Sequence, residues 1–200
     1  MKKTHLDDAP RVVVFAGPNG AGKSTHADDI LKAMGIPTFV NADYIARGLA
    51  GTNTEAVNMA AGRIMLRRLS ELAAAREDFA FESTLSSRSF APFLRRLKAA
   101  GYRIAIYSFS LDSAQLAVRR VKLRVSLGGH DVPADVVRRR FARSQTNFFA
   151  LYAPLADDWA LFDNSQAGDA RLIAELRNQH LQIEDVPSWT RLQPKNRPPT

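Results

Sequence analysis

Cysteine is absent from the 200-residue chain, which excludes disulfide bonds and thiolate chemistry. Long apolar runs are absent too, since none reaches the roughly 18 residues that a membrane-spanning helix needs. The basic start is not followed by an apolar stretch, so we expect no signal peptide. We therefore expect a cytoplasmic protein without a membrane partner. An apolar fraction of 46% in a chain of this length is typical of a folded domain with its own core.

Positive charge exceeds negative charge and is concentrated in one segment. The net charge is +8, and residues 119–143 hold eight Arg and Lys against two Asp. Such a segment is typical of the solvated face of two helices, of a nucleic-acid surface or of a clamp for phosphate groups. Charge alone leaves these three interpretations open.

Strand and helix patterns alternate along the chain, which indicates an α/β fold with a mainly parallel sheet of about five strands. Strands are predicted at 12–16, 38–40, 79–81, 102–109 and 159–162, with a further one at 181–183. Helices are predicted at 22–34, from Tyr44, after a capping box at Thr52–Glu55, and at 87–100, 113–127, 134–150 and 168–179. We expect one domain over residues 1–190 and a disordered tail over 191–200.

A phosphate-binding loop follows the first predicted strand. The motif G-x-x-x-x-G-K-[ST] lies between that strand and a predicted helix, which is the context that the motif requires. Backbone N–H groups and the helix N-terminus can then surround the phosphates of ATP. Lys23 is expected to contact the β and γ phosphates, and Ser24 to bind Mg²⁺. The predicted ATP-binding residues are Gly17, Pro18, Asn19, Gly20, Ala21, Gly22, Lys23, Ser24 and Thr25.

Other features narrow the class of P-loop protein. No N-K-x-D motif is present, which disfavours a GTPase, and the short strand before Glu82 is unlike the long apolar strand of a hydrolytic motor. A kinase needs a base for the acceptor hydroxyl and cations for the phosphoryl group in transfer. Both are present, so we predict a three-layer P-loop kinase fold with a helical lid at about 118–145 that transfers the γ-phosphoryl of ATP to a hydroxyl.

Asp43 is the predicted catalytic base, because it follows the second strand and should lie beside the phosphate-binding loop. The other interpretation is that it caps a helix beginning at Tyr44. Polar residues also follow the other predicted strands, among them Glu82 and Asn164. The carboxyl ends of parallel strands share one edge of the sheet, where ligands bind.

Four segments together resemble the zeta-toxin family, especially its small stand-alone members. They are Gly17–Thr25, Asn41-Ala42-Asp43, Phe81-Glu82-Ser83-Thr84 and Gly128-Gly129-His130-Asp131-Val132-Pro133 with the Arg-rich stretch before it. The resemblance covers roughly residues 10–165. The last three segments are more specific to the family than the phosphate-binding loop.

The resemblance implies phosphorylation of UDP-N-acetylglucosamine at its 3′-hydroxyl with ATP and Mg²⁺. By this resemblance Asp43 deprotonates the hydroxyl, and Glu82 and Thr84 line the sugar site. Arg120 and Arg124 match the first lid arginine that stabilises the phosphoryl charge. The counterpart of the second arginine is open between the three residues Arg139, Arg140 and His130.

Several alternatives stay open at this stage. Glu82 could hold a water molecule of the magnesium ion rather than contact the sugar. The chain is shorter than the plasmid-borne toxins, so toxicity and an antitoxin protein as partner remain open. Two other activities also fit the sequence: a polynucleotide or nucleotide kinase, and a nucleic-acid-binding P-loop ATPase that uses the basic segment.

Overall fold

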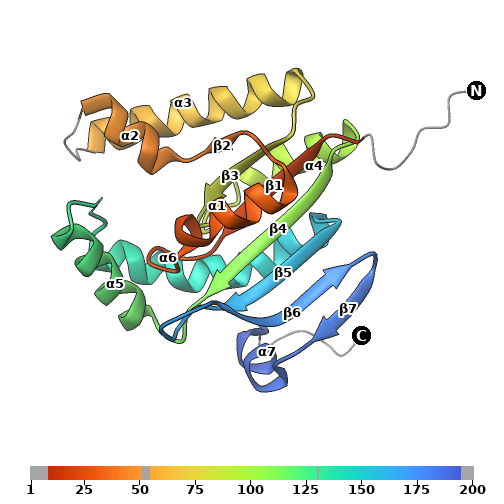
Figure 1. Ribbon diagram of the computed structural model, residues 1–200. Helices are drawn as coiled ribbons and strands as arrows, with labels where there is room; N and C mark the ends of the chain where they lie inside the picture. Colours follow the sequence, from red (N-terminus) through yellow and green to blue (C-terminus); the bar gives the residue numbers. More distant parts are fainter. Residues whose placement is uncertain (1–8, 51–54, 130, 195–200) are drawn as a thin grey trace, which may run out of the picture.

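The computed structural model describes residues 9–50, 55–129 and 131–194, and shows helices on both faces of a central sheet (Figure 1). Within these residues the sheet has seven strands in the order β2-β3-β1-β4-β5-β6-β7. They are β1 (Arg11–Ala16), β2 (Phe39–Val40), β3 (Phe79–Ser83), β4 (Arg103–Ser110), β5 (Asp158–Asp163), β6 (Arg171–Arg177) and β7 (His180–Ile183). The first five in this order pair in parallel, and β6 and β7 are antiparallel.

The central strand β1 shows why this sequence forms a sheet covered on both sides. Its β-branched and aromatic residues favour extended backbone, and successive side chains point to opposite faces. Val12 and Val14 belong to one apolar cluster, with residues of helices α3 (Glu55–Ala74) and α4 (Phe90–Ala99). Val13 and Phe15 belong to a second cluster, with residues of helices α1 (Lys23–Met34) and α5 (Ala114–Ser126). Both clusters are buried, so the phosphate-binding loop begins at the end of a strand that is packed rigidly on both faces.

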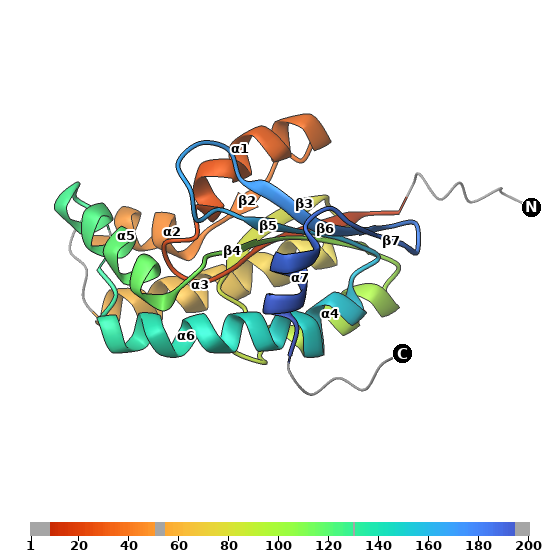
Figure 2. The same cartoon turned by 90° about the horizontal axis from the view of Figure 1, so that it is seen from below.

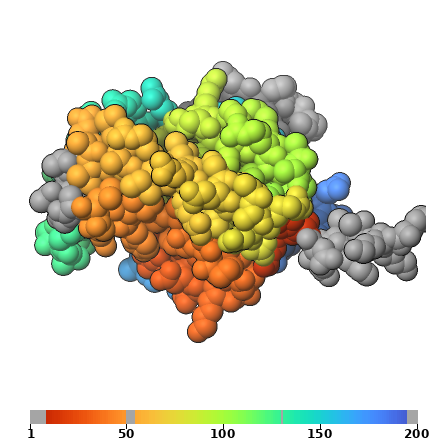
Figure 3. All heavy atoms as spheres, turned by 90° about the horizontal axis from the view of Figure 1, so that it is seen from above, coloured from red at the N-terminus to blue at the C-terminus, as the bar shows by residue number. Residues whose placement is uncertain are grey.

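Helices supply the two outer layers, and Figure 2 shows α1 and α6 on opposite faces of the sheet. The helices are α1 (Lys23–Met34), α2 (Ala42–Ala50), α3 (Glu55–Ala74), α4 (Phe90–Ala99), α5 (Ala114–Ser126), α6 (Ala134–Asn147) and α7 (Val186–Leu192). A π-helical turn (Phe148–Tyr152) and a 3₁₀ turn (Ala153–Leu155) continue from α6. Figure 3 shows α3 and α4 next to each other on the surface, with α1 and α2 beside them.

The predicted fold class is confirmed, and so are the two helices of the expected lid, α5 and α6. The expected sheet of about five strands was too small by the β6–β7 hairpin. The helix predicted at 168–179 is wrong, because β6 lies there and pairs with β5. Asn178 and Gln179 both have positive φ, 48° and 66°, and make the two-residue turn that joins β6 to β7.

The end of the chain also differs from the expectation. Helix α7 continues to Leu192, so the tail predicted from Arg191 begins inside a helix, and Arg191 pairs with Asp112. Residues 195–200 lie outside the described residues, as does most of the capping box predicted at Thr52–Glu55. None of the helices described is both long and apolar enough to cross a membrane.

Candidate active site

The phosphate-binding loop joins β1 to α1, in the place that the sequence predicts. Gly22 is the N-cap of α1 with φ of 81°, a left-handed conformation that favours glycine. A Cβ atom there would lie 2.3 Å from Nδ2 of Asn164, which itself donates to the carbonyl of Ala21 at 2.9 Å. Asn164, which directly follows β5, thus holds the phosphate-binding loop in a conformation that requires glycine at position 22.

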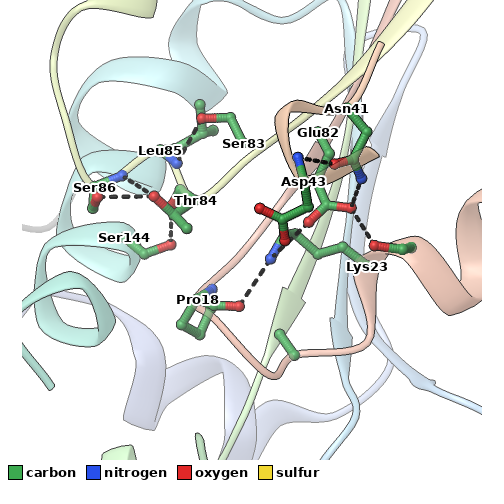
Figure 4. Close-up of polar contacts among 12 residues, drawn as sticks. Pro18, Lys23, Asn41, Asp43, Glu82, Ser83, Thr84, Leu85, Ser86 and Ser144 are labelled. Atoms are coloured by element: carbon green, nitrogen blue, oxygen red, sulfur yellow. Dashed lines mark hydrogen bonds and ion pairs between the residues drawn. The ribbon is translucent and has the colours of Figure 1, made fainter. Parts of the chain in front are cut away.

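Lys23 is buried beside the loop, with 5% of its surface exposed. Its ammonium group donates to the carbonyl of Pro18 at 3.0 Å and lies 3.4 Å from Oε1 of Glu82 (Figure 4). A buried cation at a loop of backbone N–H groups is suited to binding an anion.

Glu82, at the carboxyl end of β3, connects three neighbouring elements. Its Oε2 accepts from Ser24 Oγ at 2.5 Å and from Asn41 Nδ2 at 3.0 Å, while Oε1 faces Lys23 (Figure 4). A hydroxyl and a carboxylate side by side offer the hard oxygen ligands that Mg²⁺ prefers. The residues present therefore fit a magnesium ion, and this placement agrees with the alternative role of Glu82 beside the metal.

Asn41, which the sequence analysis did not select as a site residue, directly precedes helix α2. Its Oδ1 accepts from the backbone N–H groups of Asp43 at 2.8 Å and Tyr44 at 3.4 Å. The interpretation of Asp43 as helix cap is therefore wrong, because Asn41 performs that role and α2 begins at Ala42. The Asp43 carboxylate lies in the first turn of the helix and faces the lid. Burial, then Asp28 and Glu82, raise the pKa of Tyr44 next to it.

The two arginines selected on α5 have different contacts. Arg124 Nη1 lies 3.6 Å from Oδ2 of Asp43, so its guanidinium reaches across from the lid to α2. The guanidinium of Arg120 instead donates to three consecutive carbonyls after β5, those of Asn164, Ser165 and Gln166. Arg120 thus fastens the loop beside the nucleotide side of the site, and its predicted role in phosphoryl transfer stays a prediction.

The structure separates the three candidates for the second lid arginine. Arg139 lies on the outer face of α6, half exposed and 3.9 Å from Asp135. Arg140 faces inward and lines a cavity with Asp43. Burial first, and then the neighbouring Arg139, lower the pKa of Arg140, while Asp43 opposes this shift. His130 lies outside the described residues.

Thr84 follows β3 and is held by the lid. Its carbonyl accepts from Ser144 Oγ on α6 at 2.5 Å, and its hydroxyl pairs with that of Ser86 at 2.8 Å (Figure 4). Asn147 donates to the next carbonyl, that of Leu85, at 2.8 Å. Helix α6 therefore fixes the loop after β3, and Thr84 lines the same cavity as Arg140.

Two cavities meet at these residues. One, of about 520 Å³, is lined by the phosphate-binding loop, Arg120 and the loop after β5. The other, of about 470 Å³, lies between α2, α3, β3 and the lid. Both sizes are typical of small-molecule sites. Four charged residues line both cavities and so mark their junction: Lys23, Asp43, Glu82 and Arg124.

The second cavity contains side chains that sequence reasoning missed. Helix α3 contributes Met59, Arg63 and Leu66, which recur at the spacing of one helix face, and α4 contributes Phe90. Met59 and Leu66 are more than half exposed, at 57% and 53%. The signal available in the sequence was that these two apolar residues lie off the apolar stripe of the same helix, but the sequence did not show what that face opposes.

Other predicted polar positions lie outside this junction. Of the residues after the strands, Asn164 lines the first cavity. Asp163 is turned into its own loop, where its carboxylate accepts from the backbone N–H of Ser165 at 2.9 Å. Lys23 and Glu82, which lie on different elements, are brought together as the shared sheet edge predicts.

Comparison with known proteins gives a family and a fold. A family model described as an AAA domain matches residues 12–151. An uncharacterized protein of Haemophilus influenzae is 27% identical over 131 residues, which are 66% of this chain and 92% of that protein.

Solved structures are similar at lower sequence identity. A chain of the AvrRxo1-ORF1–AvrRxo1-ORF2 complex with ATP matches with a TM-score of 0.75 and 15% identity, covering 94% of this chain and 65% of that one. This chain therefore spans less than two thirds of that protein. The PezAT toxin–antitoxin system of Streptococcus pneumoniae matches at 0.61 with 14% identity, covering 88% and 75%. A putative kinase of Chloroflexus aurantiacus matches at 0.53 with 16% identity, covering 67% and 80%. These likenesses show a shared P-loop kinase fold.

Proposed function

The chain belongs to the family described as the AAA domain, and from this premise we propose that it is an ATP- and Mg²⁺-dependent kinase whose acceptor is a hydroxyl of a UDP-amino sugar. The observation that carries the proposal is the pair of cavities that meet at Lys23, Asp43, Glu82 and Arg124. A hydrolase needs room for a nucleotide and water, whereas this site has a second cavity of about 470 Å³ for an acceptor.

The first cavity is the proposed nucleotide site. Lys23 is placed to neutralise the β and γ phosphate oxygens, and the loop N–H groups bind the same phosphates. Ser24 and Glu82 would hold Mg²⁺, which when bound supplies positive charge to the phosphate oxygens. Arg120 keeps the loop after β5 in position at the edge of this cavity.

The second cavity is the proposed acceptor site. Asp43 lies at the junction, where its carboxylate can take the proton of an acceptor hydroxyl as the phosphoryl group moves to that oxygen. Arg124 on the lid pairs with Asp43. Its positive charge can stabilise the negative charge of the phosphoryl group during transfer. Thr84 lines the acceptor site, as proposed from the zeta-toxin resemblance.

The lining of the second cavity supports a nucleotide-sugar as acceptor. Arg63 and Arg140 both line this cavity, and two guanidinium groups together suit a diphosphate. Met59, Leu66 and Phe90 form an apolar wall against which a flat base can pack. A UDP-amino sugar combines a base, a diphosphate and free hydroxyls in one molecule.

The fold shared with a component of the PezAT toxin–antitoxin system also supports an antitoxin protein as partner. Purification of the tagged chain from its host, with identification of a protein that binds in equal amounts, tests this part. The kinase proposal does not depend on it.

The acceptor is tested by incubating the chain and γ-labelled ATP with a panel of compounds. The panel contains UDP-N-acetylglucosamine, other UDP-sugars, nucleosides and 5′-hydroxyl oligonucleotides. The proposal predicts label on the amino sugar of the UDP compounds. Label on the oligonucleotides would instead identify a polynucleotide kinase, and release of label as inorganic phosphate with every compound would identify an ATPase.

A further inference from the structure

The end of lid helix α5 contains a glycine whose place is not explained by helix termination. Helix α5 ends at Ser126 with Leu127 as its C-cap, and Gly128 follows with φ of 80°. The N–H of Gly128 bonds to the carbonyl of Val125 at 2.9 Å, and the N–H of Gly129 bonds to that of Arg124 at 2.9 Å. These two bonds form a Schellman motif, in which the left-handed residue, here Gly128, is the one that needs to be glycine.

Gly129 occupies the next position of the motif, where a hydrophobic side chain often packs against the residue five positions earlier. Gly129 does not have a positive φ, so its backbone does not call for glycine. The space around it does. A Cβ atom at this position would lie 2.5 Å from Cγ and 3.2 Å from Cδ of Arg124, and 2.8 Å from its carbonyl oxygen.

The stem of Arg124 therefore passes over Gly129 in the volume that a side chain would fill. From there the guanidinium reaches Asp43, 3.6 Å away on α2. Figures 1 and 2 show α5 and α2 at the same end of the molecule. A methyl group on Gly129 would force the stem into another rotamer, away from the junction of the two cavities, and its approach to the Arg124 carbonyl would also strain the backbone at the end of α5.

We propose that Gly129 is a positioning residue, whose missing side chain lets Arg124 cross from the lid to Asp43. This inference rests on the proposed function, since it concerns the arginine that serves phosphoryl transfer. Gly128 ends the helix, and Gly129 directs the arginine. The two adjacent glycines thus have different tasks that substitution can separate.

The test compares Gly129→Ala with Gly128→Ala, with Arg124→Ala and with the double variant Gly129→Ala/Arg124→Ala. For each protein, kcat and the KM for ATP are measured with γ-labelled ATP and UDP-N-acetylglucosamine, and the melting temperature is recorded. If the wild-type protein does not phosphorylate that compound, ADP release with water as acceptor replaces it. Gly128→Ala is the matched control, because no atom lies within 4 Å of its added Cβ although its φ is unfavourable.

We expect Gly129→Ala to lower kcat by about 10- to 100-fold, the effect of a misplaced catalytic group, with little change in the KM for ATP. Gly128→Ala should lower the melting temperature and leave kcat nearly unchanged. In the Arg124→Ala background, Gly129→Ala should cause no further loss of kcat. Full multiplication of the two losses, or equal losses of kcat in both glycine variants, would overturn the proposal.

The outcome for Arg124→Ala distinguishes a failure of the proposed function from a failure of the positioning role of Gly129. If this variant keeps the wild-type rate, the lid role assigned to Arg124 under the proposed function fails. If it loses activity while Gly129→Ala does not, only the positioning role of Gly129 fails.

Discussion

The substitution Asp43→Asn separates the roles that a carboxylate can have at the junction of the two cavities. Asparagine keeps the shape of the side chain and removes the basic oxygen. Asn41, not Asp43, caps helix α2, so the cap is unaffected. The side chains of Asp43 and Arg124 are 35% and 33% exposed, and an ion pair this exposed contributes about 0–1 kcal/mol. Loss of a negative charge in the first helical turn costs about 0.3–1 kcal/mol more.

The expected effect on catalysis is much larger than this. General-base assistance is about 10²–10⁴-fold, or about 2.7–5.4 kcal/mol at 1.36 kcal/mol for each factor of ten. Asp43→Asn should therefore bind ATP–Mg²⁺ with nearly normal affinity, melt close to the wild-type temperature, and transfer phosphate at least about a hundredfold more slowly.

The assay combines single-turnover transfer from γ-labelled ATP with calorimetric titration of ATP–Mg²⁺. Asp29→Asn is the matched control, since it removes the same charge from an exposed position on α1. A transfer rate close to that of the wild type would refute the assignment of Asp43 as base. A parallel loss of ATP–Mg²⁺ affinity would show that Asp43 serves the metal or the nucleotide instead.

Three further predictions test neighbouring groups. Lys23→Ala should lower turnover by about 10²-fold or more and leave the fold intact, because Glu82 keeps its bonds to Ser24 and Asn41. Enzyme assays and circular dichroism of this variant and of the control Lys32→Ala check the prediction, and near-normal turnover of Lys23→Ala would contradict it. Arg124→Ala should lower kcat by about 10³-fold, whereas Arg120→Ala should mainly weaken ATP binding because it frees the loop after β5. ATP titration and kinetics of both variants test this, and equal changes of kcat and ATP affinity in the two variants would disprove the division of roles. Asn147→Ala should destabilise the protein by about 1–3 kcal/mol, since it leaves the buried carbonyl of Leu85 without its donor. Urea unfolding measures this loss. The control Thr146→Ala, on the exposed face of the helix, should change stability little, and equal losses in the two variants would count against the prediction.

Features that depend on neighbours in the chain could be predicted from the sequence. The phosphate-binding loop is one, because its glycines, lysine and serine form the motif within eight residues that lie between a β-branched strand and a helix. The carboxyl ends of the parallel strands then explain why Glu82 was expected near Lys23, although 58 positions separate Glu82 from Ser24.

Features that depend on tertiary pairing could not be predicted in the same way. Residues 171–177 have leucines and isoleucine at a spacing that also fits a helix, and only the open edge of β5 makes them a strand. The sequence contains Arg139 and Arg140 as equals, yet the packing of α6 turns one to Asp135 and the other to Asp43. Asn41 was a recognisable helix cap, but Asp43 two positions later offered the same chemistry.

The central claim is that two cavities meeting at Lys23, Asp43, Glu82 and Arg124 make this chain a kinase rather than an ATPase. The most direct test is the ratio of products when purified protein consumes ATP–Mg²⁺ in the presence of UDP-N-acetylglucosamine. The account predicts ADP and phosphorylated amino sugar in equal amounts, with ADP release dependent on the sugar. ADP accompanied by an equal amount of inorganic phosphate, at a rate that the sugar does not change, would contradict it.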